Sequence, residues 1–136
     1  KGKPETGTIR MKARNEKDTV FIEVSDDGAG IDGKRIREKA IQKGLISGEH
    51  AALISEKDAI NFIFEPGFSN AEKITEVSGR GVGMDVVKRA TESIGGKIEV
   101  TTEVGAGSSF IMALPSSMAV KGALLFELNH QDYAIR

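Results

Sequence analysis

Two stretches of alternating apolar and polar residues near the start of the chain constrain its fold more than any other feature. The first covers residues 8–13 and the second covers residues 20–24, and the polar segment 15–18 separates them. Alternation with a period of two places the apolar side chains of a strand on one face. The pattern therefore predicts an antiparallel hairpin with one buried face.

Helical patterns follow this hairpin, and two more strand patterns follow the helices. In chain order, the predicted elements are helices at 33–43, 59–64 and 83–93, a long loop at 68–83, and strands at 97–103 and 108–114. Asp32 is expected to cap the first helix, and Ser55 with Asp58 forms a capping pair before the second. This order predicts an α+β fold, a two-layer sandwich with a mixed, mostly antiparallel sheet.

A change of pattern at 115–117 divides the chain into two expected domains, 1–117 and 118–136. The second contains a strand at 123–128 and the start of a partner strand at 133–136. A lone hairpin is only marginally stable in water, so we expect the chain to stop inside its second domain.

The composition is that of an ordinary globular protein, with 39% hydrophobic and 29% charged residues and a formal net charge of -1. Balanced charge gives no basic field for nucleic acid, and no apolar run reaches membrane-spanning length, so neither partner is expected. The absence of cysteine excludes disulfides and thiolate metal sites. His50 and His130 have no second ligand at metal-binding spacing and are predicted to be surface residues.

The residues Asp-Asp-Gly-Ala-Gly-Ile at 26–31 directly follow the second predicted strand. A carboxylate at a strand end can accept a hydrogen bond from an exocyclic amine such as that of adenine, and the glycines let the backbone pass close to a flat ring. An acidic turn between a strand and a helix explains the same residues equally well. Both interpretations stay open at this point.

A second glycine cluster, Gly-Arg-Gly-Val-Gly-Met at 79–84, opens a predicted helix. Alternate glycines expose backbone N–H groups, and a helix N-terminus favours an anion, so the cluster is typical of a phosphate cradle. It lacks the Gly-Lys-Ser/Thr ending of a P-loop and the spacing of a dinucleotide fingerprint. A flexible linker before a helix is the alternative.

Two weaker signals lie outside these clusters. The aromatic side chains of segment 62–68 are more typical of a core than of a cofactor contact. Ser108, at the start of a predicted strand, is placed to lie beside a base, although a turn residue explains it more simply.

Taken in this order, the two glycine clusters and the phenylalanine segment resemble the ATP-binding boxes of the GHKL superfamily. That superfamily includes histidine kinases, gyrase-type topoisomerases, the heat-shock 90 chaperones and mismatch-repair ATPases, and the phenylalanine segment indicates the histidine-kinase branch. Segments 64–69 and 77–87 closely resemble chemotaxis histidine kinases of the CheA type. The resemblance covers nearly the whole chain and implies the two-layer ATP-binding fold of that superfamily.

This resemblance implies ATP and Mg²⁺ as cofactors and a role for each matching residue. Asp26 would bind the adenine amine, directly and through water. The residues expected to line the base are Gly28, Gly30, Ile31 and Ser108. The residues expected near the triphosphate, most of them in a lid, are Arg35, Gly79, Arg80, Gly81, Val82, Gly83 and Met84. For the charges of Arg80 and Lys73, a solvated surface role remains the favoured alternative.

The family's Mg²⁺ ligand is an asparagine on a helix expected to precede the first hairpin. Asn15, Asn61 and Asn70 do not lie in that context, so we expect an incomplete metal site and assign no metal ligand or catalytic residue. We also expect an uncovered apolar sheet surface and no kinase activity from this chain alone.

The implied function is transfer of the ATP γ-phosphoryl group to a histidine on a separate phosphotransfer domain of a dimeric, cytoplasmic kinase. Residues 123–136 resemble the opening hairpin of an SH3-like regulatory domain, which would begin at residue 118 and bind a coupling protein and chemoreceptors. A response regulator would then receive the phosphoryl group. The alternatives are an ATPase of the same superfamily and an inactive scaffold module.

Overall fold

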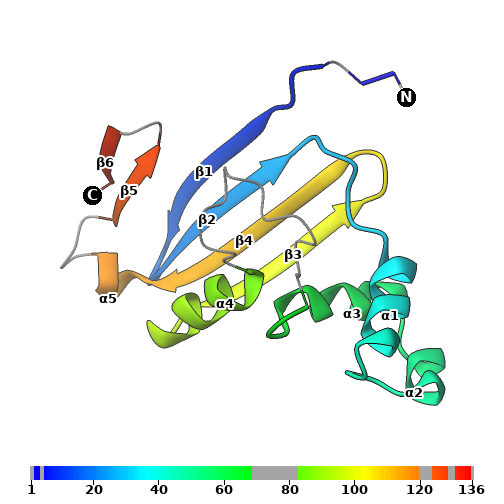
Figure 1. The fold of residues 1–136 in the computed structure, drawn as a ribbon. Helices are drawn as coiled ribbons and strands as arrows, with labels where there is room; N and C mark the ends of the chain where they lie inside the picture. Colours follow the sequence, from blue (N-terminus) through cyan, green and yellow to red (C-terminus); the bar gives the residue numbers. More distant parts are fainter. Residues whose placement is uncertain (1, 4, 69–82, 120–123, 129–130, 136) are drawn as a thin grey trace.

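The computed structural model describes residues 2–3, 5–68, 83–119, 124–128 and 131–135 of the chain. Within these residues, four strands form one sheet in the order β1-β2-β4-β3 (Figure 1). The strands are β1 (Ile9–Glu16), β2 (Thr19–Asp26), β3 (Lys97–Glu103) and β4 (Gly107–Pro115). The predicted hairpin of β1 and β2 is confirmed, and the two strands predicted near 97–114 form a second hairpin, which the pairing of β2 with β4 joins to the first.

Every neighbouring pair in this sheet is antiparallel. The expectation of a mixed sheet is therefore corrected to a fully antiparallel one in the described part of the chain. The helical connection leads from β2 to the edge strand β3, and the turn after β3 brings β4 beside β2 in the opposite direction, so no parallel pair arises there.

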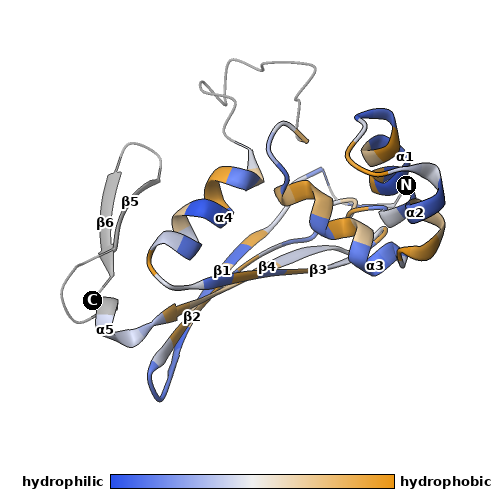
Figure 2. Cartoon of the chain, turned by 90° about the horizontal axis from the view of Figure 1, so that it is seen from below, coloured by the Kyte–Doolittle hydropathy of each residue, from blue (hydrophilic) through white to orange (hydrophobic). Residues whose placement is uncertain are grey.

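Helices follow each hairpin, and those between β2 and β3 lie on one face of the sheet (Figure 2). They are α1 (Gly33–Gln42), α2 (Gly48–Leu53), α3 (Glu56–Ala59), the 3₁₀ helix η1 (Ile60–Phe64), α4 (Met84–Ser93) and α5 (Ser116–Ala119). As predicted, Asp32 caps α1 by accepting from the amide of Lys34 at 2.9 Å. The Ser55 hydroxyl likewise accepts from the amide of Asp58 at 3.1 Å.

The second predicted helix, 59–64, is divided between α3 and η1. Branched and aromatic residues lose rotamer freedom in an α-helix, and the apolar run that forms η1 consists largely of such residues. The tighter 3₁₀ turn brings Ile63 and Phe64 into the core, where both are buried.

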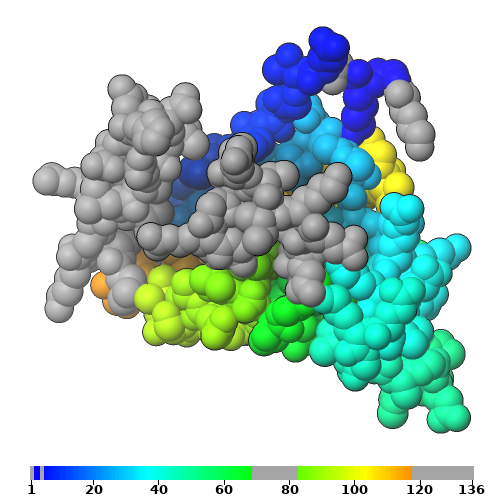
Figure 3. All heavy atoms as spheres, in the orientation of Figure 1, coloured from blue at the N-terminus to red at the C-terminus, as the bar shows by residue number. Residues whose placement is uncertain are grey.

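The core lies between this helical layer and the half of the sheet formed by β3 and β4. Ala40, Ile63, Phe64 and Phe68 are buried there, and the partly buried side chains packed against them include Ile98, Val100 and Phe110. In the space-filling view, α4, η1 and α1 form a continuous band along this side of the molecule (Figure 3). The predicted two-layer arrangement is confirmed for the described residues.

The other half of the sheet is less covered. All residues of β1 are exposed, and its apolar side chains Ile9 and Met11 are 77% and 54% exposed. They lie on the same face as the core side chains of β4, because Met11 pairs with Val24 and Val24 with Phe110. An apolar strip of sheet is thus left open by the described residues.

Beyond α5, the strands β5 (Leu124–Leu128) and β6 (Gln131–Ile135) form a separate antiparallel hairpin. A hairpin is what the sequence predicts here, with the partner strand beginning two residues earlier than expected. Among the helices of the described residues, none has both the length and the apolar character that a membrane crossing requires.

Candidate functional site

On the helix-facing side of the sheet, three strands each carry a row of apolar side chains that ends in a polar residue, and the three polar residues lie at the same end of the sheet. Asp26 lies two residues beyond Val24 on β2, Ser108 two residues before Phe110 on β4, and Thr102 two residues beyond Val100 on β3. Across the paired strands, Asp26 lies opposite Ser108, and Ser108 lies opposite Thr102. Because strand side chains alternate between faces, all three project from the face that carries the core.

Asp26 is exposed at the last position of β2. Its Oδ1 accepts a hydrogen bond of 2.7 Å from the amide of Gly28. A Cβ at Gly28 would lie 2.5 Å from that oxygen, so a side chain there would displace the carboxylate. This glycine therefore allows the backbone to turn tightly around the carboxylate and hold one of its oxygens.

Gly30 is the tightest point of the loop that follows β2. Its φ is +72°, and a Cβ there would lie 2.1 Å from the carbonyl oxygen of Glu103. The adjacent Ala29 carbonyl accepts a 2.7 Å hydrogen bond from the amide of Gly105. The loop is thus seated directly on the turn between β3 and β4.

Gly107 brings the start of β4 equally close to β2. Its φ is +127°, and a Cβ there would lie 2.0 Å from the carbonyl oxygen of Asp26. The neighbouring Ser108 is only 8% exposed. Backbone contact at Gly107 therefore fixes the distance between the Asp26 and Ser108 side chains.

Thr102 is a residue that the sequence analysis missed. Its Oγ1 accepts from the amide of Ile31 at 2.8 Å, donates to the carbonyl of Gly107 at 3.0 Å, and lies 2.9 Å from the Ser108 hydroxyl. One hydroxyl thus ties the loop after β2 to β4. A polar residue continuing the apolar row of Ile98 and Val100 was the sequence signal that could have identified it.

The Asp27 carboxylate binds the backbone of the segment that precedes β1. Its Oδ1 accepts a 2.8 Å hydrogen bond from the amide of Thr8, and this bond lowers the pKa of the carboxyl, with the charge of Lys3 acting in the same direction. The Lys3 ammonium also donates to the carbonyls of Asp27 and Gly28. Asp27 therefore anchors the segment before β1, which leaves Asp26 as the carboxylate on the site's side.

The predicted phosphate-binding residues are described only in part. Arg35 lies exposed in the first turn of α1, next to the Asp32 cap. Gly83 is the N-cap residue of α4 and makes no side-chain cap, and Met84 packs against the core. The remaining candidates, Gly79, Arg80, Gly81 and Val82, lie outside the described residues, as does Lys73.

The phenylalanine segment is core, as expected. Phe64 and Phe68 are 5% and 3% exposed. The Lys39 ammonium lies 5.3 Å from the centre of the Phe68 ring, and the Lys43 ammonium donates to the carbonyl of Gly67 at 2.5 Å. The end of this segment, just before residues 69–82, is therefore held by one lysine of α1 and by the lysine that directly follows that helix.

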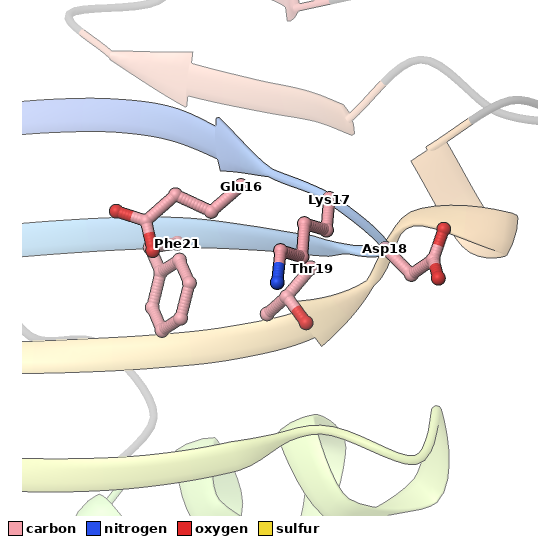
Figure 4. Close-up of a pocket in the computed structure, with 5 residues that line it drawn as sticks. All are labelled: Glu16, Lys17, Asp18, Thr19 and Phe21. Carbon is pink, nitrogen blue, oxygen red and sulfur yellow. The ribbon is translucent and has the colours of Figure 1, made fainter.

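Two hollows of the described surface lie at or near the ends of the sheet, and only one of them touches a polar residue of this group. One of about 690 Å³ lies at the β1–β2 turn, lined by Glu16, Lys17, Asp18, Thr19 and Phe21 (Figure 4), at the opposite end of the hairpin from Asp26. Another of about 380 Å³ borders Ile31 and Thr102 beneath α3. Neither is lined by Asp26 or Ser108, so the residue chemistry and not the hollow identifies the site.

No cluster of three or more His, Asp or Glu able to hold a metal occurs among the described residues. His50 is exposed on α2, where its Nδ1 lies 3.0 Å from the Ser47 hydroxyl, as expected for a surface residue. His130 lies outside the described part of the chain.

Residues 1–118 match the model of the family described as histidine kinase-, DNA gyrase B- and HSP90-like ATPases. The chain is 48% identical over 134 residues to the gliding motility regulatory protein of Myxococcus xanthus, covering 98% of this chain and 17% of that protein. It is 44% identical over 135 residues to the chemotaxis protein CheA of Bacillus subtilis, covering 99% of this chain and 20% of that protein.

A third relative, the sensor histidine kinase CheAY of Helicobacter pylori, is 47% identical over 133 residues, which are 98% of this chain and 17% of that protein. The chain thus spans about a fifth of the length of the curated relatives it matches.

Proposed function

Because the chain belongs to the family of histidine kinase-, DNA gyrase B- and HSP90-like ATPases, we propose that it is the ATP-binding catalytic domain of a chemotaxis histidine kinase. The observation that carries the proposal is the Asp26 carboxylate, held at the end of β2 by the Gly28 amide and paired across the strands with Ser108. The oxygen atoms of these two side chains can both accept hydrogen bonds from a bound group. An adenine amine fits this arrangement, since it carries two hydrogen-bond donors.

In this proposal Asp26 binds the exocyclic amine, and Gly28, Gly30 and Ile31 line the flat face of the base. Strand-to-loop contacts at Gly30 and Gly107 support these roles, because each brings backbone segments closer than any side chain would allow. The loop is therefore preorganised, which reduces the ordering cost of nucleotide binding.

The triphosphate would extend toward α4. An α-helix presents unpaired amides at its first turn, and Gly83 and Met84 lie there without a side-chain cap. Gly79, Arg80, Gly81 and Val82 belong to the same proposed phosphate-binding segment. Arg35 would add positive charge from the first turn of α1.

Mg²⁺ normally binds through one or two protein ligands together with substrate phosphates. The described residues do not supply a cluster for it, so we assign the protein ligand to a segment outside them. The open apolar strip at Ile9 and Met11 is a surface that a further helix would cover, and such a helix is where the asparagine ligand is expected.

Transfer of the γ-phosphoryl group breaks its bond to the bridging oxygen of ADP and forms a bond to an imidazole nitrogen. The histidine belongs to a separate phosphotransfer domain, so this chain contributes positioning and charge neutralisation. We propose that the parent protein is a cytoplasmic homodimer that passes the group on to a response regulator.

The proposed domain boundary lies after residue 117. Residues 1–117 form the catalytic unit, and 118–136 begin an SH3-like regulatory domain that binds a coupling protein and chemoreceptors. The separate hairpin of β5 and β6 supports this division, since it pairs with no strand of the larger sheet within the described residues.

Incubation of the full-length protein with ATP labelled on its γ-phosphate tests the function. Label on a histidine, lost in Asp26→Ala, is the expected result. Release of labelled phosphate with no phosphohistidine at any time would instead indicate an ATPase. Absence of nucleotide binding would indicate a scaffold module.

A further inference from the structure

The hydroxyl of Thr102 has three hydrogen-bond neighbours but a single proton. The carbonyl of Gly107, 3.0 Å away, is able only to accept, so it takes that proton. The amide of Ile31, 2.8 Å away, is able only to donate, so it uses one lone pair of Thr102. The remaining lone pair faces the Ser108 hydroxyl at 2.9 Å.

The proton of Ser108 is consequently committed to Thr102. Ser108 is 8% exposed, and its oxygen keeps only lone pairs for any other neighbour. Asp26, its direct cross-strand partner, is also an acceptor when ionised. Side chains directly opposite one another on antiparallel strands have Cβ atoms about 5 Å apart, so both oxygens reach one small group.

We propose that Thr102 is a specificity-determining residue, which selects a nucleobase with an exocyclic amino group by forcing Ser108 to act as an acceptor. A base with a carbonyl oxygen in place of the amino group would place that oxygen against the Asp26 and Ser108 acceptors, with no hydrogen-bond donor among the three. Thr102 does not touch the base and acts through Ser108. This inference rests on the proposed function, and its test separates the two.

The test compares the affinities of the full-length protein for ATP and for inosine triphosphate, in which a carbonyl oxygen replaces the 6-amino group. Thr102→Val removes the hydroxyl at nearly constant shape and leaves the Ser108 proton free to turn toward the ligand. We expect the ratio of the two affinities to fall about tenfold, the usual effect of one net hydrogen bond. The variant also loses the hydrogen bond from the Ile31 amide, which should weaken the binding of both nucleotides equally and so leave the affinity ratio unchanged.

Matched variants isolate the cause. Thr102→Ser keeps the hydroxyl and should keep the wild-type ratio. Thr101→Val makes the same chemical change on the neighbouring, exposed residue of β3, on the other face, and should also leave the ratio unchanged. Thr102→Cys, with a weaker donor, should give an intermediate ratio and replaces the valine variant if that one does not fold.

A double-mutant cycle with Ser108→Ala decides whether the effect passes through Ser108. We expect Thr102→Val to leave the ratio unchanged in the Ser108→Ala background. An equal loss of affinity for both nucleotides in Thr102→Val, or an effect on the ratio that persists without Ser108, overturns the inference while the proposed function stands. Failure of the wild type to bind either nucleotide overturns both.

Discussion

The amide of Gly105 donates a 2.7 Å hydrogen bond to the carbonyl oxygen of Ala29. This bond joins the turn between β3 and β4 to the loop that leaves β2, two segments more than 70 residues apart in the chain. Gly30, the next residue, lies against Glu103 with its φ at +72°. The position of the loop around Asp26 therefore depends on a distant hairpin as much as on its own sequence.

Gly30→Ala should destabilise the chain strongly. Its Cβ would lie 2.1 Å from the Glu103 carbonyl oxygen, in a backbone conformation that alanine adopts poorly, and we expect a loss of about 3 kcal/mol or more in the free energy of unfolding. Gly105→Ala is the matched control, because its φ is +87° but its Cβ would meet nothing within 4 Å. It should cost about 1 kcal/mol. Equal losses in urea unfolding would refute the role of the close contact.

Asp32→Ala should weaken the start of α1, where the lost carboxylate accepts from the amides of Lys34 and Arg35. We expect a loss of about 1 kcal/mol, the usual cost of an N-cap, in thermal or urea unfolding. Asp32→Ser restores a capping oxygen and should recover most of that loss. A serine variant as unstable as the alanine variant would show that capping is not the cause.

Asp27 should make the anchoring of the segment before β1 depend on pH. Its pKa is lowered from the usual 3.8, chiefly by the Thr8 amide, so the folded state binds this proton less well than the unfolded state does. The stabilisation is therefore present above pH 3.8 and is lost as the pH falls through the lower folded pKa. It should be small, because the group is exposed.

Hydrogen exchange of the Thr8 amide measures this effect. In Asp27→Asn we expect faster exchange than in the wild type near neutral pH, after correction for the intrinsic rate, and convergence of the two in acid. Asp18→Asn, at the opposite end of the hairpin, should match the wild type throughout. A difference between wild type and Asp27→Asn that persists unchanged in acid would contradict the assignment.

The strands, the caps and the core face could be predicted from local patterns. Alternation places Val20, Ile22 and Val24 on one face, and a side chain such as Asp32 before a helical run caps its own helix. These relationships involve neighbours in the sequence. The pairing of β2 with β4 was left open, because it brings together residues more than 80 positions apart.

The candidate site divides in the same way. Asp26 and the glycines stand out in the sequence, because a carboxylate at a strand end and repeated glycines are unusual there. Thr102 does not, since its role arises only when β3, β4 and the loop after β2 meet. The division of segment 59–64 between an α-helix and a 3₁₀ helix could not be predicted either, because an apolar run does not distinguish α from 3₁₀ geometry.

Calorimetric titration of the chain and of the full-length protein with ATP, with and without Mg²⁺, tests the central claim most directly. Wild type should bind, and Asp26→Ala should bind about ten to a hundred times more weakly, as expected for loss of a hydrogen bond to a charged group. Asp27→Ala, which removes the neighbouring carboxylate that faces Thr8, should stay close to wild type. Equal affinity in wild type and Asp26→Ala would contradict the adenine site proposed at the end of β2.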